Sequence, residues 1–130
     1  MKSLLAFGVA LQISSAYAQG VEPMPCMDAA NTIEKNLCLG REVEALDKVI
    51  SAQVSRIAAV LRGRDADEPV VRLAPAFASS QAKWQQFRDA ECSFRSLSFG
   101  SGTGATAEFA FCKMEHGRLR LSHLQGFRYQ

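Results

Sequence analysis

The sequence lacks the motifs of the common hydrolases and of zinc modules. It has no Gly-x-Ser-x-Gly elbow and no His-Glu-x-x-His pair, so neither a serine hydrolase nor a metalloprotease of these types is indicated. Its four cysteines are separated by 12, 54 and 20 positions, and none of these gaps is the close pairing that a zinc module needs. We therefore expect a protein that binds rather than catalyses, with no metal ion and no cofactor.

The charge balance and the hydropathy pattern argue against further classes. The chain has 15 Lys and Arg against 13 Asp and Glu, whereas a nucleic-acid binder would show a basic stripe. Beyond the first 18 residues there is no apolar segment of membrane length. Alternation with a period of two residues is not sustained anywhere, so we expect no β-strands.

The N-terminus has the pattern of a cleaved export signal. Lys2 precedes an apolar stretch from Leu4 to Ile13, and Ala16-Tyr17-Ala18 is a small-x-small site for signal peptidase. No cysteine follows this site, so lipid attachment is not expected. We predict a signal peptide at 1–18, a single domain at 19–130, a periplasmic or secreted location and no stable membrane insertion.

The cysteine count predicts disulfides, because an exported chain matures in an oxidising compartment and the count is even. Four cysteines allow three connectivities, and spacing alone does not choose among them. Geometry favours Cys26–Cys38, if a helix break at Gly40 lets the lead segment fold back, and Cys92–Cys112, which would join two successive helices. The pairing of Cys38 with Cys92 stays open, since it also suits antiparallel helices.

Helical periodicity begins at a capping box. The side chain of Asn31 is expected to accept a hydrogen bond from the first turn, while Glu34 reaches back to Asn31. Ile33 and Leu37 share one face of this short helix, which we expect to end near Leu39, before Gly40. A second helix of about six turns is predicted from the spacing of Val43, Leu46, Ile50, Val54, Ile57 and Leu61. The polar segment 63–69 is expected to end it.

Two more helices are expected in the second half of the chain. The first begins near Pro75, a favourable first-turn residue, and is expected to bury Phe77, Trp84, Phe87 and Phe94. The second covers about 105–124 and is expected to bury Phe109, Cys112, Leu119 and Leu124. Gly117 in its interior costs about 1 kcal/mol relative to alanine. The predicted fold class is all-α, a small disulfide-stapled bundle of three to four antiparallel helices.

The residues around the cysteines resemble the LprI-like lysozyme-inhibitor family. Segment 26–38 has the family's opening, a cysteine, an Asn or Thr cap, Glu-Lys and a second cysteine, and Leu46-Asp47 follows it. Segment 81–92 is similar to its hallmark, a Gln and a Trp leading to Arg-Asp and a third cysteine. The resemblance covers essentially the whole mature chain and departs from the family pattern at Gly117. The motif residues are Asn31, Glu34, Gln81, Trp84, Arg88, Asp89 and Arg120.

The resemblance implies an exported, non-enzymatic domain whose partner is a protein. That partner would be a lysozyme or another peptidoglycan hydrolase, which the domain would bind and block. The same blocking activity could make the domain an immunity protein. The alternative is a periplasmic structural or envelope-stress accessory domain that binds another protein and inhibits no enzyme. The family label alone does not decide between them, because a fold does not carry a function by itself.

The motif residues allow a structural and a functional interpretation. Trp84 and Arg88 lie four apart, so the guanidinium can stack on the indole, and Gln81 belongs to the same packing layer. Arg88-Asp89 could recognise a sugar or an enzyme carboxylate. We favour the structural interpretation, in which Arg88 ties two helices together and Asp89 pairs across the bundle. His116 and His123 lie seven apart, too far for two ligands of one metal on a helix, and are expected to be solvated or half-packed.

A Gly-rich connection between 98 and 106 is the best candidate for a partner-binding surface. A flexible tip with a base fixed by a disulfide would enter an enzyme cleft at a small ordering cost. Because a lysozyme-type cleft holds two carboxylates, hydroxyls and a cation would suit it. The alternative is a helix connection that binds nothing. The candidate residues are Arg95, Ser98, Gly100, Ser101, Gly102, Thr103 and Gly104.

Overall fold

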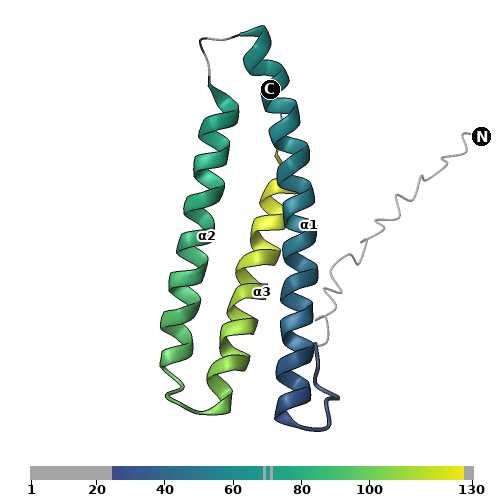
Figure 1. Ribbon diagram of the computed structural model, residues 1–130, viewed down its shortest axis with the longest axis vertical. Coiled ribbons are helices and arrows are strands. Elements are labelled where there is room, and N and C mark those ends of the chain that lie inside the picture. The colour runs from purple at the N-terminus through teal and green to yellow at the C-terminus, as the bar shows by residue number, and fades with distance from the viewer. Residues whose placement is uncertain (1–24, 69, 71, 128–130) are drawn as a thin grey trace, which may run out of the picture.

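The described part of the chain folds as a bundle of three antiparallel helices (Figure 1). The computed structural model describes residues 25–68, 70 and 72–127, where α1 spans Thr32–Asp67, α2 Leu73–Leu97 and α3 Thr103–Gln125. The predicted all-α fold is therefore confirmed, whereas the predicted signal peptide and its cleavage site lie outside the described residues. None of the helices in this part of the chain has the length and hydropathy of a membrane span.

The first helix is continuous, and the predicted break at Gly40 is wrong. A β-carbon at Gly40 would meet nothing within 4 Å, so the backbone there is under no steric demand. A glycine inside a helix costs about 1 kcal/mol, and burial of Leu39 and Ile50 on either side outweighs that cost. α1 also continues through Gly63. It ends at Asp67, within the polar segment 63–69 that was expected to end it. Its C-cap is Glu68, directly before a proline, which disfavours helical backbone in the residue preceding it.

Side-chain caps hold the beginnings of α1 and α2. At the start, Asn31 Oδ1 accepts from the N–H of Glu34 at 3.0 Å, as predicted. The Glu34 carboxylate accepts instead from the N–H of Ala30, at 3.2 Å, and not from Asn31. At the other end, the Asp65 carboxylate accepts from the N–H groups of Leu73 and Ala74, both at 2.8 Å. Asp65 therefore caps the beginning of α2, with Pro75 in the first turn as expected.

Among the described residues, the core consists of two apolar clusters along α1. One lies near the start of α1 and contains Cys26, Leu39, Ala110 and Met114. The other contains Ile50, Ile57, Leu61 and Leu124. The apolar stripe predicted for 43–61 is thus confirmed, because its members are buried or partly buried.

Several predicted core residues are exposed instead. Three side chains of α2 and α3 were expected in the core but face solvent: Phe87 is 55%, Phe94 68% and Leu119 56% exposed. Ile33 and Leu37, for which only a shared helix face was predicted, are exposed as well. On α2 the inward face carries Gln81, Arg88 and Cys92, and bonds from this face to the other helices fix the rotation of α2. Phe87 and Phe94 lie to the side of that face.

Both disulfides have the local pairing that geometry favoured. Cys26–Cys38 ties the lead segment to α1, and Cys92–Cys112 ties α2 to α3. The reason given for the first pair was wrong, since α1 does not break at Gly40. The lead segment turns back at Cys26 itself, whose φ of 64° lies in the left-handed region.

Candidate functional site

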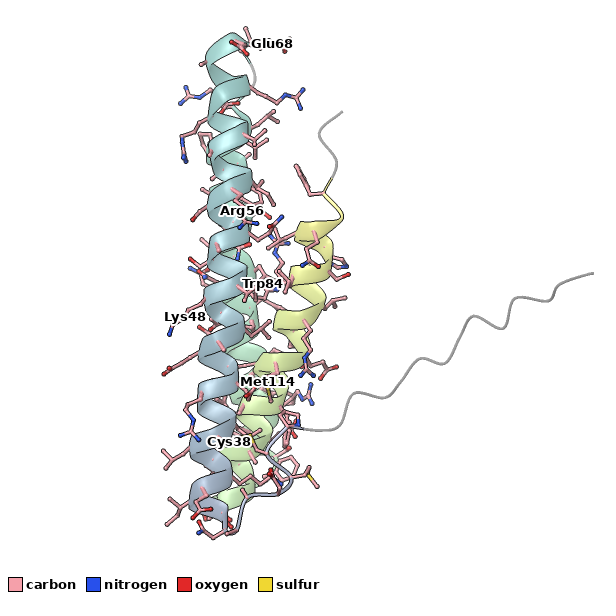
Figure 2. All side chains as sticks on the ribbon, turned by 90° about the vertical axis from the view of Figure 1, so that its right-hand side faces the viewer. Cys38, Lys48, Arg56, Glu68, Trp84 and Met114 are labelled. Atoms are coloured by element: carbon pink, nitrogen blue, oxygen red, sulfur yellow. A yellow bond between two sulfur atoms is a disulfide. The ribbon has the colours of Figure 1, made fainter. Side chains whose placement is uncertain are left out.

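Four of the motif residues meet in one polar layer across the middle of the bundle. We define this layer as Gln81, Trp84 and Arg88 from α2, Arg120 from α3 and Asp47 from α1. Trp84 lies about midway along the bundle (Figure 2). The sequence pointed to the first four as family residues. Asp47 was noticed only as part of the resemblance, and no helical pattern marks it as the partner of an arginine 41 positions away.

Arg88 joins α2 to α1. Its Nη1 and Nη2 atoms donate to the two carboxylate oxygens of Asp47 at 2.6 and 3.1 Å, a bidentate pair. The Arg88 side chain is 6% exposed and that of Asp47 is 38% exposed. The guanidinium also lies 4.8 Å from the ring centroid of Trp84, the stacking contact anticipated from their spacing.

Arg120 joins α3 to α2 without a carboxylate among the described residues. Its Nε and Nη2 atoms donate to Oε1 of Gln81 at 3.0 and 2.8 Å, and its guanidinium lies 5.6 Å from the Trp84 ring centroid. Burial lowers the pKa of Arg120 from its ordinary value. Trp84 thus has two arginines over its ring, one from its own helix and one from α3.

Asp89 lies beside this layer and faces α3. Its carboxylate is 3.1 Å from Nζ of Lys113 and 3.8 Å from Nε of Arg88. Arg88 and Asp89 therefore both make contacts between helices, which is the arrangement that the structural interpretation describes.

The Gly-rich connection is shorter than expected. α2 ends at Leu97, and five residues, 98–102, lead to α3. Gly100 has a φ of 66°, which a residue with a side chain rarely adopts, and Gly102 is the N-cap of α3. Thr103 and Gly104, which were predicted to lie in the loop, belong to the first turn of α3.

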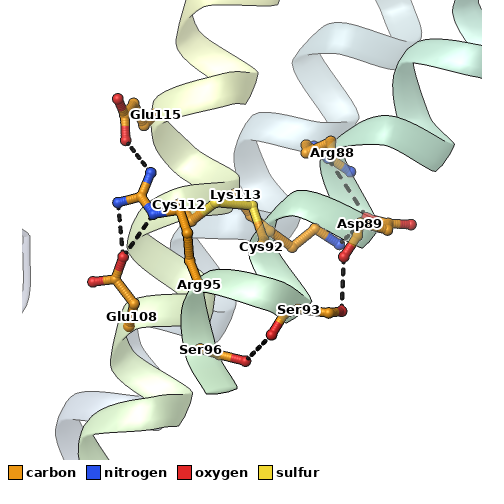
Figure 3. Close-up of a disulfide and its surroundings, with 10 residues drawn as sticks. All are labelled: Arg88, Asp89, Cys92, Ser93, Arg95, Ser96, Glu108, Cys112, Lys113 and Glu115. Atoms are coloured by element: carbon orange, nitrogen blue, oxygen red, sulfur yellow. Dashed lines mark hydrogen bonds and ion pairs between the residues drawn. A yellow bond between two sulfur atoms is a disulfide. The ribbon is translucent and has the colours of Figure 1, made fainter. Parts of the chain in front are cut away.

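The base of this connection is fixed by a disulfide and by Arg95 (Figure 3). Arg95 donates from Nε to Glu108 at 2.9 Å and from Nη1 to Glu115 at 2.8 Å. The hydrogen bonds that Arg95 donates to Glu115 and, second, to Glu108 raise the pKa of its guanidinium. Its charge is therefore engaged by two carboxylates of α3. Ser98, the C-cap of α2, donates from its hydroxyl to the Arg95 carbonyl at 2.6 Å.

Large apolar side chains are exposed where α2 enters the connection. Phe94 is 68%, Leu97 75% and Phe99 55% exposed, and we call these three residues the apolar tip. The Phe99 ring lies over the first turn of α3, with Cδ1 3.4 Å from the position of a β-carbon on Gly104. The sequence did not reveal this feature, because Phe94 was predicted to be buried.

The histidines do not form a metal site with the cysteines. His116 lies within 4.8 Å of both sulfur atoms of Cys92 and Cys112, but these are joined in a disulfide and offer no thiolate. The His116 ring packs edge-on against Phe87, with centroids 5.5 Å apart. His123 is exposed in the last turn of α3.

Comparison with known proteins gives one result. The family model described as "Lysozyme inhibitor LprI" matches residues 26–124, which include both disulfides, the whole polar layer and the Gly-rich connection. No curated protein and no solved structure matches the chain.

Proposed function

Because the chain belongs to the LprI lysozyme-inhibitor family, we propose that it is an exported, non-enzymatic protein that binds and blocks a peptidoglycan-cleaving lysozyme-type enzyme. The observation that carries the proposal is the extent of the family match, which runs from the first cysteine to the last turn of α3. The same activity would serve as immunity against a wall hydrolase delivered by a competitor.

We assign the inhibitory contact to the end of the bundle formed by 98–102 and the apolar tip. The ends of this connection are held by Cys92–Cys112 and by the bonds of Arg95, so little conformational entropy is lost when it is bound. Phe94, Leu97 and Phe99 offer the large apolar area that dominates binding energy at interfaces.

This end of the bundle does not offer the free cation that was expected to suit a lysozyme-type cleft. Arg95 is already paired with Glu108 and Glu115 and does not supply a free cation. Donors toward the carboxylates of a lysozyme-type cleft would instead come from the hydroxyl of the exposed Ser101 and from the backbone N–H groups of Ser101 and Gly102, since the other three N–H groups of 98–102 already donate to carbonyls of α2.

The test uses the oxidised domain 19–130 in micromolar excess over c-type, g-type and i-type lysozymes, with clearing of labelled peptidoglycan as the readout. We expect slower clearing with at least one of them. The variant Ser101→Trp, which leaves Gly100 unchanged, and the double variant Phe94→Ala/Leu97→Ala should lose the inhibition while keeping their helicity.

A matched control comes from the opposite end of the bundle. Val70 is 95% exposed in the connection between α1 and α2, so Val70→Ala removes exposed apolar area without touching the proposed contact. This variant should inhibit as the parent does. If no lysozyme is slowed and none co-elutes with the domain, the accessory-domain alternative is favoured.

A further inference from the structure

A cavity of about 290 Å³ opens between α1 and α2, beside the polar layer. The wall from α1 consists of Asp47, Ile50, Ser51 and Val54, and the wall from α2 consists of Gln81, Trp84 and Gln85. Its volume is at the lower limit of small-molecule sites. The cavity lies midway along both helices and shares no residue with the apolar tip or with 98–102.

The two walls carry opposite hydrogen-bonding groups whose orientation is fixed. Asp47 is held by the two donors of Arg88 and presents carboxylate oxygens, which only accept. Gln81 is 6% exposed, and its Oε1 accepts both bonds from Arg120. Since arginine can only donate, this contact settles which amide atom of Gln81 faces Arg120. The NH2 group of Gln81 is therefore left as a donor.

An acceptor on one wall and a donor on the other are complementary to a secondary amide. In a trans amide the N–H and the C=O point in opposite directions, so one group can face Asp47 while the other faces Gln81. Ile50, Val54 and the Trp84 ring provide an apolar surface for a methyl group. The indole N–H of Trp84 makes no hydrogen bond to any other described residue, and Ser51 and Gln85 add polar groups suited to sugar hydroxyls.

We infer that this cavity binds the acetamido group of an N-acetylated amino sugar. The polar groups are arranged before the ligand arrives, because structural bonds to two arginines already hold Asp47 and Gln81, and such preorganisation reduces the cost of binding. The inference does not depend on the inhibition of any enzyme. It makes the domain a saccharide-binding protein through residues far from the proposed inhibitory end.

The chain carries its own reporter for the test, since Trp84 is the only tryptophan in the sequence. The oxidised domain is titrated with N-acetylglucosamine and its trimer, with tryptophan emission and equilibrium dialysis as readouts. We expect a saturable change in emission. The deacetylated trimer should bind about tenfold more weakly or worse, since each tenfold loss is about 1.4 kcal/mol.

Variants separate binding from folding. Gln81→Glu keeps a partner for Arg120 but replaces the NH2 donor by an acceptor. Its affinity for the sugar should therefore fall about tenfold or more, while the domain remains folded. Gln85→Ala removes a polar group from the wall and should weaken binding. Its neighbour Gln86 is exposed and does not line the cavity, so Gln86→Ala should bind as the parent does.

Each result of these binding experiments either supports or overturns the proposed sugar site. Saturable binding of the acetylated sugars that is lost in Gln81→Glu supports the site. The inference is overturned by an absence of saturable binding, by equal binding of the deacetylated trimer, or by unchanged affinity in Gln81→Glu. It is also overturned if N-acetyl-alanine methylamide, which has the amide but no sugar ring, binds as tightly as N-acetylglucosamine. The lysozyme assay is read separately, so failure of one proposal leaves the other standing.

Discussion

Gly117 of α3 packs directly against Leu46 of α1. A β-carbon at position 117 would lie 2.7 Å from Cδ2 and 3.3 Å from Cγ of Leu46, and 3.4 Å from Cδ1 of Ile50. The missing side chain is therefore what allows the two helices to approach at this point. A residue that looks unfavourable from helix propensity alone thus leaves room for the side chains of Leu46 and Ile50 against α3.

We expect Gly117→Ala to destabilise the fold by about 1 kcal/mol or more, since the cost of overpacking exceeds the gain in helix propensity. Gly40 is the matched control, because it lies inside α1 and a β-carbon there meets nothing within 4 Å. Gly40→Ala should stabilise by about 0.5–1 kcal/mol. Urea unfolding of both variants measures the difference. Equal gains in stability at the two positions would refute the packing argument.

The pair Arg88–Asp47 should show strong energetic coupling. Removing either partner leaves a charge that has lost its bidentate bonds, and we expect Asp47→Ala and Arg88→Ala each to cost about 2–4 kcal/mol. Because the second substitution removes the group left unpaired by the first, the double variant should cost clearly less than the sum. A coupling energy of about 2 kcal/mol from a double-mutant cycle is the expected result.

The pair Asp89–Lys113, whose carboxylate is more exposed than that of Asp47, provides the control for that cycle. Its atoms are 3.1 Å apart, but the Asp89 side chain is 57% exposed, so water screens the interaction. The coupling energy of this pair should stay below about 1 kcal/mol. A coupling as large as that of Arg88–Asp47 would mean that burial is not what distinguishes the two pairs.

The two disulfides should contribute unequally to stability. Cys92–Cys112 joins two helices through fully buried sulfurs, and replacing both cysteines by alanine should lower the free energy of unfolding by about 3 kcal/mol. Cys26–Cys38 ties down only the lead segment, which can detach while the three helices stay packed. Its loss should cost less and should show mainly as faster proteolysis before residue 32. Chemical unfolding and limited digestion of the two double variants compare these effects, and equal losses of stability would contradict the argument.

The sequence predicted the helices and their apolar contacts more successfully than their boundaries. The stripe in 43–61 was recognisable because six apolar residues recur at helical spacing. The break at Gly40 was predicted wrongly, since a glycine is a stop signal only when the chain also needs a left-handed residue there. In this protein Gly100 has that conformation and Gly40 does not.

The orientation of α2 could not be obtained from hydrophobicity. Its aromatic residues suggest one inward face, but the face chosen carries a disulfide, a bidentate ion pair and the Gln81–Arg120 bonds. These interactions depend on Asp47, Arg120 and Cys112, which come from other helices and leave no local pattern. The polar layer was therefore visible from the sequence only as motif residues of a family, without the contacts that join them.

The last prediction concerns the turn between α1 and α2, where Asp65 substitutes for a missing cap. Arg72, the N-cap of α2, makes no capping bond with its side chain, and the Asp65 carboxylate accepts from both Leu73 and Ala74. Asp65→Ala should cost about 1–2 kcal/mol, the usual value of a lost N-cap, and should allow the first turn of α2 to fray. Asp67 is exposed and its side chain bonds no described residue, so Asp67→Ala should change the free energy of unfolding by less than about 0.5 kcal/mol. Amide hydrogen exchange at Leu73 and Ala74 is the sharper readout, because loss of the cap should speed exchange there and leave the middle of α2 protected. Unchanged exchange at these two amides in Asp65→Ala would show that the carboxylate does not hold the turn.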